Sequence, residues 1–285
     1  MIAPPVHESA GGGRLLRGFL AATRLLSRNP DGLPARATVQ LLMRSPLPEV
    51  TCVNADGHRM LVDPRDQMEA NALLGRYRLP RRIVDLVQPG DWVIDAGANV
   101  GIISSQLCAA VGRTGLVSAW EPIERNVARL RFLKEENALA QLSVVPCAAG
   151  AENSTVTIGV SARGRSGWSS ITASWGTGQT AEVPVRRLDA DGENEAARRR
   201  LRMIKIDVEG YEFEVLEGAR GLLERFRPWI YCEFNDVVLR DRGRSSTELL
   251  DFLVTLGYRP AEPRPDFDGR AENLLLAPEA EQPER

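Results

Sequence analysis

From Trp92 onward, short apolar runs alternate with longer segments in which apolar residues recur at helical spacing. The runs are apolar at consecutive positions, a pattern typical of strands in a parallel sheet that helices cover on both faces. The sequence therefore predicts an α/β fold. The predicted strands are 92–95, 116–121, 142–149, 202–208 and 229–234, and the predicted helices begin at 101 and span 123–137, 211–226 and 246–256.

Two regions depart from this alternation. Before it, the Asp56-Gly57 turn predicts a hairpin within 50–63, and 68–87 is expected to form one or two helices. After Ala149, strand-like segments flank a polar, glycine-rich stretch, which predicts an inserted hairpin or lid over the mouth of the sheet. The last apolar segments predict a closing antiparallel pair. The expected division is a helical and hairpin extension over 1–88, the main domain over 89–278 and a disordered tail over 279–285.

Charge and cysteine usage exclude some classes of partner. The chain has 36 Lys and Arg against 38 Asp and Glu, a net charge of -2, so no overall positive field would attract nucleic acid. No segment reaches membrane-spanning length. The four cysteines, Cys52, Cys108, Cys147 and Cys232, show no close paired spacing, which favours reduced thiols in a cytoplasmic protein over disulfides.

An amphipathic helix is expected at 14–28, where leucines and phenylalanine interleave with arginines. Its apolar stripe could pack on the main domain, join two subunits in a homodimer or lie on a membrane surface. We favour packing of this helix on the main domain or on a second subunit over docking on a membrane surface. The remaining expected partner is a small molecule.

The stretch DWVIDAGANVGI, from Asp91 to Ile102, runs from a strand through a glycine-rich turn into a helix. Such a unit binds nucleotide-like ligands, but the dinucleotide fingerprint GxGxxG fails because Asn99 and Ile102 replace two of its glycines. Asp95 ends the strand, where a carboxylate would repel a pyrophosphate and attract an ammonium group. The turn therefore favours a ligand with an amino-acid end.

The second strand ends in Glu121, a position at which a carboxylate accepts hydrogen bonds from both hydroxyls of a ribose. A nucleoside joined to an amino acid describes S-adenosylmethionine. We expect Glu121 to hold its ribose and residues at the end of the third strand to lie beside its adenine. The expected cofactor-binding residues are Asp95, Gly97, Asn99, Gly101, Glu121, Cys147 and Ala148.

Methyl transfer to a hydroxyl requires a group that accepts the hydroxyl proton. Asp207 and Glu209 follow the strand containing Lys205, and Glu233 and Asn235 end the next predicted strand, so these side chains should converge on one cleft. We interpret Asp207, Glu209 and Glu233 as candidate catalytic residues. Glu209 has an alternative role in capping the following helix.

The same carboxylates offer oxygen ligands that a magnesium ion accepts, although no metal is expected. Lys205, inside an apolar strand, could pair with one of them and hold its pKa low.

The motifs PGDWVIDAGANVGI, AWEP, VPCAAG, SGWSSI and MIKIDVEGYEFEVLEGA resemble the FkbM family of S-adenosylmethionine-dependent methyltransferases. The last motif, from Met203 to Ala219, is the most specific. The resemblance covers most of the chain between Val50 and Asn235. It implies a class I Rossmann-like fold with a mostly parallel seven-stranded sheet, and O-methylation of a sugar or polyketide-type hydroxyl in natural-product or surface-glycan pathways.

The substrate side is expected to include Tyr77, Trp168, Ser170 and Asn235. Members of the family often carry Glu after the aromatic residue at the position of Tyr77, where this chain has Arg78. N-methylation, a nicotinamide-dependent oxidoreductase and a binding protein without turnover remain alternatives.

Overall fold

The computed structural model describes residues 33–44, 49–159, 180–190, 199–263, 267 and 271–279. The helix expected at 14–28, Trp168, Ser170 and the expected tail beyond Glu279 lie outside the described residues. In the part that is described, no helix is both long and apolar enough to cross a membrane.

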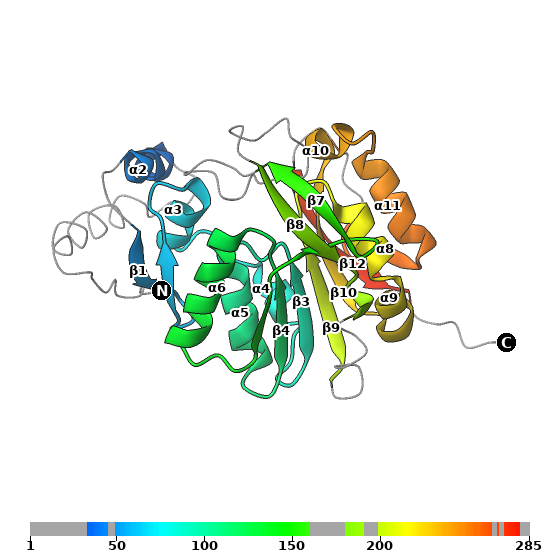
Figure 1. Ribbon diagram of the computed structural model, residues 1–285, viewed down its shortest axis with the longest axis horizontal. Helices are drawn as coiled ribbons and strands as arrows, with labels where there is room; N and C mark the ends of the chain where they lie inside the picture. Colours follow the sequence, from blue (N-terminus) through cyan, green and yellow to red (C-terminus); the bar gives the residue numbers. More distant parts are fainter. Residues whose placement is uncertain are drawn as a thin grey trace.

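A seven-stranded sheet forms the centre of the molecule, with the strand order β11-β12-β10-β9-β3-β4-β5 (Figure 1). The five strands from β10 to β5 are parallel, and β12 runs antiparallel to both β10 and β11. The α/β fold and the closing antiparallel pair are therefore confirmed. The strands are β3 (Trp92–Ala96), β4 (Leu116–Trp120), β5 (Leu142–Val145), β9 (Leu201–Ile206), β10 (Trp229–Asn235), β11 (Tyr258–Pro260) and β12 (Ala271–Pro278).

Helices cover both faces of the sheet, because alternate residues of the buried strands point to opposite sides. In β3, Val93 belongs to the apolar cluster that includes residues of α4, α5 and α6, whereas Trp92 and Ile94 belong to the cluster that includes residues of α8, α9 and α11. The helices are α4 (Arg81–Val84), α5 (Ile102–Val111), α6 (Glu124–Glu136), α8 (Glu212–Gly218), α9 (Arg220–Phe226), α10 (Asp236–Arg240) and α11 (Ser246–Thr255).

The helix expected over 211–226 is interrupted between α8 and α9. A Cβ atom at Gly218 would lie 1.9 Å from the carbonyl oxygen of Gly150, so the chain passes this point in backbone contact with the neighbouring loop. Ala219 between the two helices has φ -105 and ψ 2, which is not helical geometry. A packing requirement thus divides the predicted helix.

The insertion after Ala149 forms a hairpin, as expected. Strands β7 (Ser154–Gly159) and β8 (Thr180–Arg186) pair antiparallel. The third predicted strand is shorter than expected, because β5 ends before Pro146 and the chain then pairs with β8 as β6 (Ala148–Ala149). The three strands make a second sheet in the order β6-β8-β7, seen above the main sheet in Figure 1.

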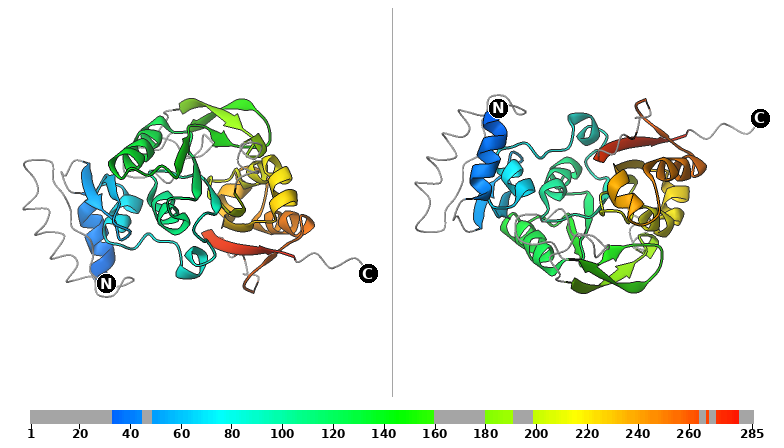
Figure 2. Two further views of the ribbon diagram at one scale, coloured as in Figure 1. Left: turned by 90° about the horizontal axis from the view of Figure 1, so that it is seen from below. Right: turned by 90° about the horizontal axis from the view of Figure 1, so that it is seen from above.

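The N-terminal extension contains α2 (Leu33–Met43), the hairpin β1 (Val50–Val53) and β2 (Arg59–Val62), and α3 (Gln67–Leu73). Helices α2 and α3 lie side by side at one end of the molecule (Figure 2). Arg129 of α6 bonds Glu69 of α3 at 2.6 Å, and both side chains are buried. A buried ion pair therefore ties the extension to the main domain.

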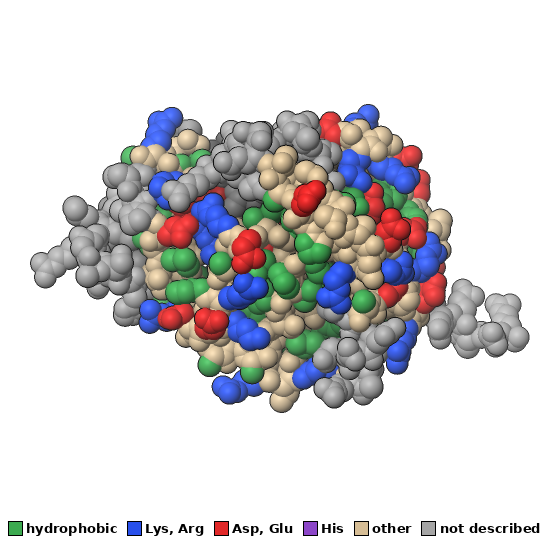
Figure 3. All heavy atoms as spheres, in the orientation of Figure 1, with side chains coloured by type: hydrophobic (Ala, Val, Ile, Leu, Met, Phe, Trp, Pro, Cys, Tyr) green, Lys and Arg blue, Asp and Glu red, His purple; other side chains and the backbone are tan. Residues whose placement is uncertain are grey.

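Acidic and basic side chains are interspersed over the face in Figure 3, as expected for a net charge near zero.

Arg78 forms an ion pair with Asp56 at 3.1 Å, on the hairpin of the extension.

Candidate active site

A cavity of about 360 Å³ opens beyond the carboxyl ends of β3, β4 and β9. The chain leaves β3 toward β4 on one side while β9 flanks β3 on the other, and ligands of α/β sheets bind at such a switch of strand order. Residues that line the cavity include Gly97, Ala98, Asn99, Trp120, Glu121, Ala148, Asp207, Val208, Glu209 and Glu233.

Gly97 stands where the turn after β3 meets the turn after β9. Its φ is +79, and a Cβ atom there would lie 1.8 Å from the carbonyl oxygen of Asp207. Only glycine fits this contact. Gly97 lines the cavity, and its contact with a cofactor stays a prediction.

Glu121 is held at the cavity by hydrogen-bond donors on both of its oxygens. The backbone N–H of Asn99 donates to Oε2 at 2.8 Å, and the backbone N–H of Ile123 donates to Oε1 at 2.9 Å. Burial raises the pKa of Glu121 to about 7, although these two donors act in the opposite direction. The carboxylate is thus fixed at the position predicted for ribose recognition.

The contact predicted between Asp95 and an ammonium group stays a prediction, and Asp95 is not among the residues that line the cavity. Its side chain has no exposed area, accepts a hydrogen bond from Ser104 Oγ at 2.6 Å and lies 3.1 Å from Lys205 Nζ. This carboxylate is therefore held by Ser104 and Lys205 inside the protein.

Gly101 and Cys147 are also not among the cavity-lining residues. A Cβ atom at Gly101 would lie 2.7 Å from a methyl group of Leu130, so this glycine allows α6 to pack against the turn. Cys147 is buried, whereas Ala148 and Ala149 line the cavity because β6 turns away from the main sheet.

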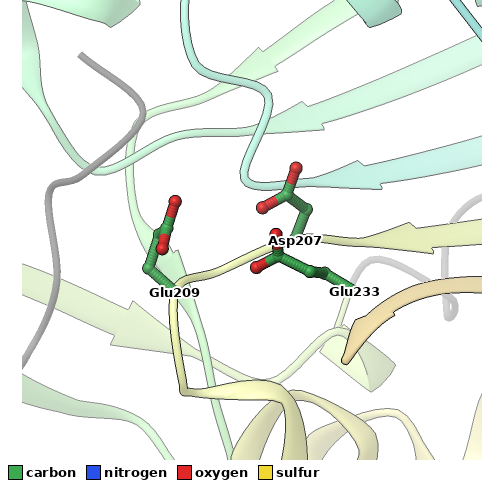
Figure 4. Close-up of side chains that lie close together, drawn as sticks. All are labelled: Asp207, Glu209 and Glu233. Atoms are coloured by element: carbon green, nitrogen blue, oxygen red, sulfur yellow. The ribbon is translucent and has the colours of Figure 1, made fainter. Parts of the chain in front are cut away.

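Three carboxylates meet at the other end of the cavity. Figure 4 shows Asp207 and Glu209 on the segment after β9 and Glu233 near the end of β10. One oxygen from each lies within 4.8 Å of the others. The predicted convergence of these residues is therefore seen, whereas Asn235 is the residue before α10 and is not among those that line the cavity.

Burial and like charge dominate the electrostatics of this end. Burial, followed by the charge of Asp207, raises the pKa of Glu209 to about 9 and that of Glu233 to about 10. Each of these two carboxyl groups therefore favours its protonated form near neutral pH.

Lys205 lies between the two ends of the cavity and is 5% exposed. Its ammonium group donates to the carbonyl oxygen of Gly97 at 2.8 Å and lies 3.7 Å from Asp207 Oδ2. Burial alone would lower the pKa of Lys205, but Asp95 and Asp207 raise it above its ordinary value. The predicted pairing of Lys205 with carboxylates is confirmed.

The helix-capping role considered for Glu209 stays a prediction, and the turn before α8 is bonded by Glu212. The Oε1 atom of Glu212 accepts hydrogen bonds from the backbone N–H groups of Val208 at 3.3 Å and Gly210 at 3.2 Å. Glu209, between them, has φ +53 and lines the cavity.

Tyr77 lines the cavity, as expected for the substrate side. Burial, followed by the charge of Asp207, raises its pKa. Sequence reasoning missed the contribution of α3, since its cavity-lining residues Gln67, Met68 and Asn71 lie in an ordinary helical pattern. The Asp66 cap, whose carboxylate accepts from the N–H of Met68 at 2.9 Å, was the available signal for the start of that helix.

Several buried polar atoms at the cavity have no hydrogen-bond partner. Among the described residues, Asn99 Oδ1, Trp120 Nε1 and Glu233 Oε2 are such atoms, and all three residues line the cavity. Unsatisfied buried polar atoms are rare in folded proteins. Their gathering here fits a ligand with several polar groups, such as the amino-acid and nucleoside parts of S-adenosylmethionine.

The mostly parallel seven-stranded sheet, with its cavity at the switch of strand order, has a Rossmann-like α/β architecture. The family model described as the methyltransferase FkbM domain matches residues 95–260. The chain therefore belongs to the FkbM methyltransferase family, whose methyl donor is S-adenosylmethionine. The oxidoreductase alternative is thereby dropped.

Several solved structures are similar to the chain. Methyltransferase FkbM from Methylobacillus flagellatus shares 16% identity with a TM-score of 0.42, and the match covers 93% of this chain and 60% of that protein. Trm5b from Pyrococcus abyssi shares 15% identity with a TM-score of 0.43 over 81% of this chain and 56% of that one. TYW2 from M. jannaschii, in complex with AdoMet, shares 12% identity with a TM-score of 0.39, and the match covers 80% of this chain and 84% of that one. No curated protein matches the chain.

Proposed function

We propose that this methyltransferase transfers its methyl group to a hydroxyl of a small molecule, such as a sugar, a polyketide-type natural product or a glycan. The observation that carries the proposal is the meeting of Asp207, Glu209 and Glu233 within 4.8 Å at one end of the cavity. An aliphatic hydroxyl needs a base, whereas an amine that is already neutral does not.

We assign one of the three carboxyl groups as the base and the other two as hydrogen-bond donors. Asp207 is the one with a cation beside it, since Lys205 Nζ lies 3.7 Å from its Oδ2. Glu209 and Glu233, with pKa values raised to about 9 and 10 by burial, hold protons near neutral pH. In this proposal Asp207 accepts the proton of the acceptor hydroxyl, and the two protonated glutamic acids donate hydrogen bonds that orient it.

S-adenosylmethionine, when bound, supplies a methyl group on a sulfonium that is open to attack by the acceptor oxygen. Gly97, Asn99 and Glu121 would hold it, since all three line the opposite end of the same cavity. The positive charge of the sulfonium would also reduce the repulsion among the nearby carboxylates.

The test is methyl transfer from labelled S-adenosylmethionine to a panel of sugars, glycans, polyketide alcohols and matched amines, with the product bond identified by NMR. We expect methyl ethers, and we expect Asp207→Asn to lower turnover at least hundredfold while S-adenosylhomocysteine binds within threefold of wild type. Transfer to nitrogen only would replace this proposal with N-methylation.

A parallel assay with EDTA, followed by added magnesium, examines the metal alternative. Asp207, Glu209 and Glu233 offer carboxylate oxygens of the kind that magnesium accepts. The proposal expects full turnover in EDTA. Turnover that EDTA abolishes and magnesium restores would instead assign the three carboxylates to a metal ion.

A further inference from the structure

The turn that carries Glu209 has an unusual backbone. Glu209 and Gly210 are consecutive residues with positive φ, +53 and +96. Glycine adopts this conformation freely, but a residue with a Cβ atom does so at a cost in free energy. Something in the surrounding structure must therefore hold Glu209 in place.

Glu212 contacts the backbone on both sides of Glu209. Its Oε1 accepts hydrogen bonds from the N–H groups of Val208 and Gly210, the two immediate neighbours of Glu209. The Glu212 side chain is 2% exposed and lies outside the cavity lining. Glu212 therefore bonds the backbone of the turn without lining the cavity, whereas Glu209 lines it.

The second oxygen of Glu212 makes this arrangement costly. Oε2 is buried and has no hydrogen-bond partner among the described residues. An apolar side chain of similar size would avoid that cost. The hydrogen bonds of Oε1 to the turn are the compensating gain that the structure shows.

Displacement of this turn would also affect the cofactor end of the cavity, which is the end lined by Gly97, Asn99 and Glu121. The carbonyl oxygen of Asp207 occupies the space where Gly97 would carry a Cβ atom, so the segment after β9 packs directly on the turn after β3. Any shift of residues 207–210 therefore changes the shape of the cavity on both sides.

We propose that Glu212 is a positioning residue that clamps the turn in its left-handed conformation and so directs Glu209 into the cavity. The inference rests on the proposed function only for the role of Glu209 at the acceptor. The clamp itself requires nothing but the backbone geometry and the two hydrogen bonds.

The first experiment measures the affinity of the full chain for S-adenosylhomocysteine by isothermal titration. Glu212→Ala, which removes the clamp, should bind at least fivefold more weakly than wild type. Glu212→Gln, which keeps an acceptor oxygen, should bind within twofold. Glu217→Ala, on the same helix with its carboxylate paired to Arg220 at the surface, is the matched control and should match wild type.

A double-mutant cycle with Glu209→Gly separates clamping from general support of the fold. Glycine adopts positive φ without help, so Glu212→Ala should change the affinity by less than twofold when residue 209 is glycine. An equal loss in the wild-type and Glu209→Gly backgrounds would overturn the clamp, because a general structural role does not depend on the residue at position 209.

Hydrogen exchange keeps the inference testable if Glu212→Ala does not fold in either background. The amides of Val208 and Gly210 should exchange at least tenfold more slowly than unprotected amides in wild type, and faster in Glu212→Gln than in wild type. Unprotected rates in wild type would overturn the clamp. Failure of wild type to bind S-adenosylhomocysteine at all would count against the cofactor assignment and leave this exchange test in force.

Discussion

The two ends of the cavity hold their carboxylates in opposite ways. At the cofactor end, both oxygens of Glu121 accept backbone hydrogen bonds, from Asn99 and Ile123. At the acceptor end, Glu209 and Glu233 face other carboxylates, and Oε2 of Glu233 has no partner among the described residues. The Glu121 carboxylate is therefore held before a ligand binds, whereas Glu209 and Glu233 lie where like charges repel, and a proton or a cationic ligand relieves that repulsion.

Gly97 and Lys205 join the two ends of the cavity. Gly97 touches the carbonyl of Asp207, and Lys205 bonds Gly97 while lying beside Asp207. Substitutions at this junction should affect both ends, and substitutions within one end should affect that end alone.

The largest effect is expected for Gly97→Ala, which breaks the junction. The new Cβ atom would lie 1.8 Å from the carbonyl oxygen of Asp207, and φ +79 is unfavourable for alanine. We expect a loss of about 5 kcal/mol or more in the free energy of unfolding, or no folded protein. Urea denaturation measures it.

Gly75→Ala is the control for the backbone conformation alone. Gly75 has φ +73, but no atom of the described residues beyond its chain neighbours lies within 4 Å of its Cβ position. A loss of about 1 kcal/mol is expected there. If the two variants lost equal stability, the contact between Gly97 and Asp207 would not be what requires glycine.

Lys205→Met removes the shared cation. It leaves Asp95, which has no exposed area, without its ion-pair partner at 3.1 Å. Removal of one member of a buried pair costs about 3–5 kcal/mol, because the other charge stays buried. Thermal and urea unfolding measure the change, and Lys134→Met on α6 is the matched control, expected within about 0.5 kcal/mol of wild type. A loss below about 1 kcal/mol for Lys205→Met would mean that Asp95 does not depend on this cation.

Glu121→Ala breaks the cofactor end alone. It removes the carboxylate that is proposed to bind the ribose hydroxyls, together with the acceptor of the Asn99 N–H. Affinity for S-adenosylhomocysteine should fall about thirtyfold to hundredfold, or by about 2–3 kcal/mol. Isothermal titration measures it against Glu124→Ala, a carboxylate with 77% of its side chain exposed three residues along the chain. Equal affinities of the two variants would remove Glu121 from the site.

The sequence was sufficient to predict the parallel sheet because strand and helix periodicities are local properties. It also predicted the convergence of Asp207, Glu209 and Glu233, since parallel strands end at one edge of a sheet. The side-chain direction of Asp95 could not be predicted in this way, because it depends on Ser104 and Lys205.

Other features that the sequence did not predict share the same cause. The end of β5 at Val145 depends on pairing between Ala148 and Val185, which is far along the chain. The packing role of Gly101 depends on Leu130 and not on the turn that contains it. Spacing along the chain predicts which residues lie near the cavity, but tertiary contacts decide which of them face it.

Glu233→Gln sharpens the comparison at the acceptor end and has the smallest expected effect. Burial, followed by the charge of Asp207, raises the pKa of Glu233 to about 10 in the folded protein, against an ordinary value near 4.5. The folded state therefore binds an additional proton between about pH 4.5 and 10, and the stability of wild type falls as pH rises through that range.

Glutamine does not titrate, so Glu233→Gln should equal wild type near pH 4 and exceed it near pH 6 by about 1–2 kcal/mol, or about 4 °C in Tm. Glu217→Gln at the surface is the control and should show no such divergence. Parallel pH profiles for Glu233→Gln and wild type would show that no repulsion is stored at Glu233. A divergence that S-adenosylmethionine reduces would show that the positive charge of the cofactor and the proton on Glu233 relieve the same repulsion.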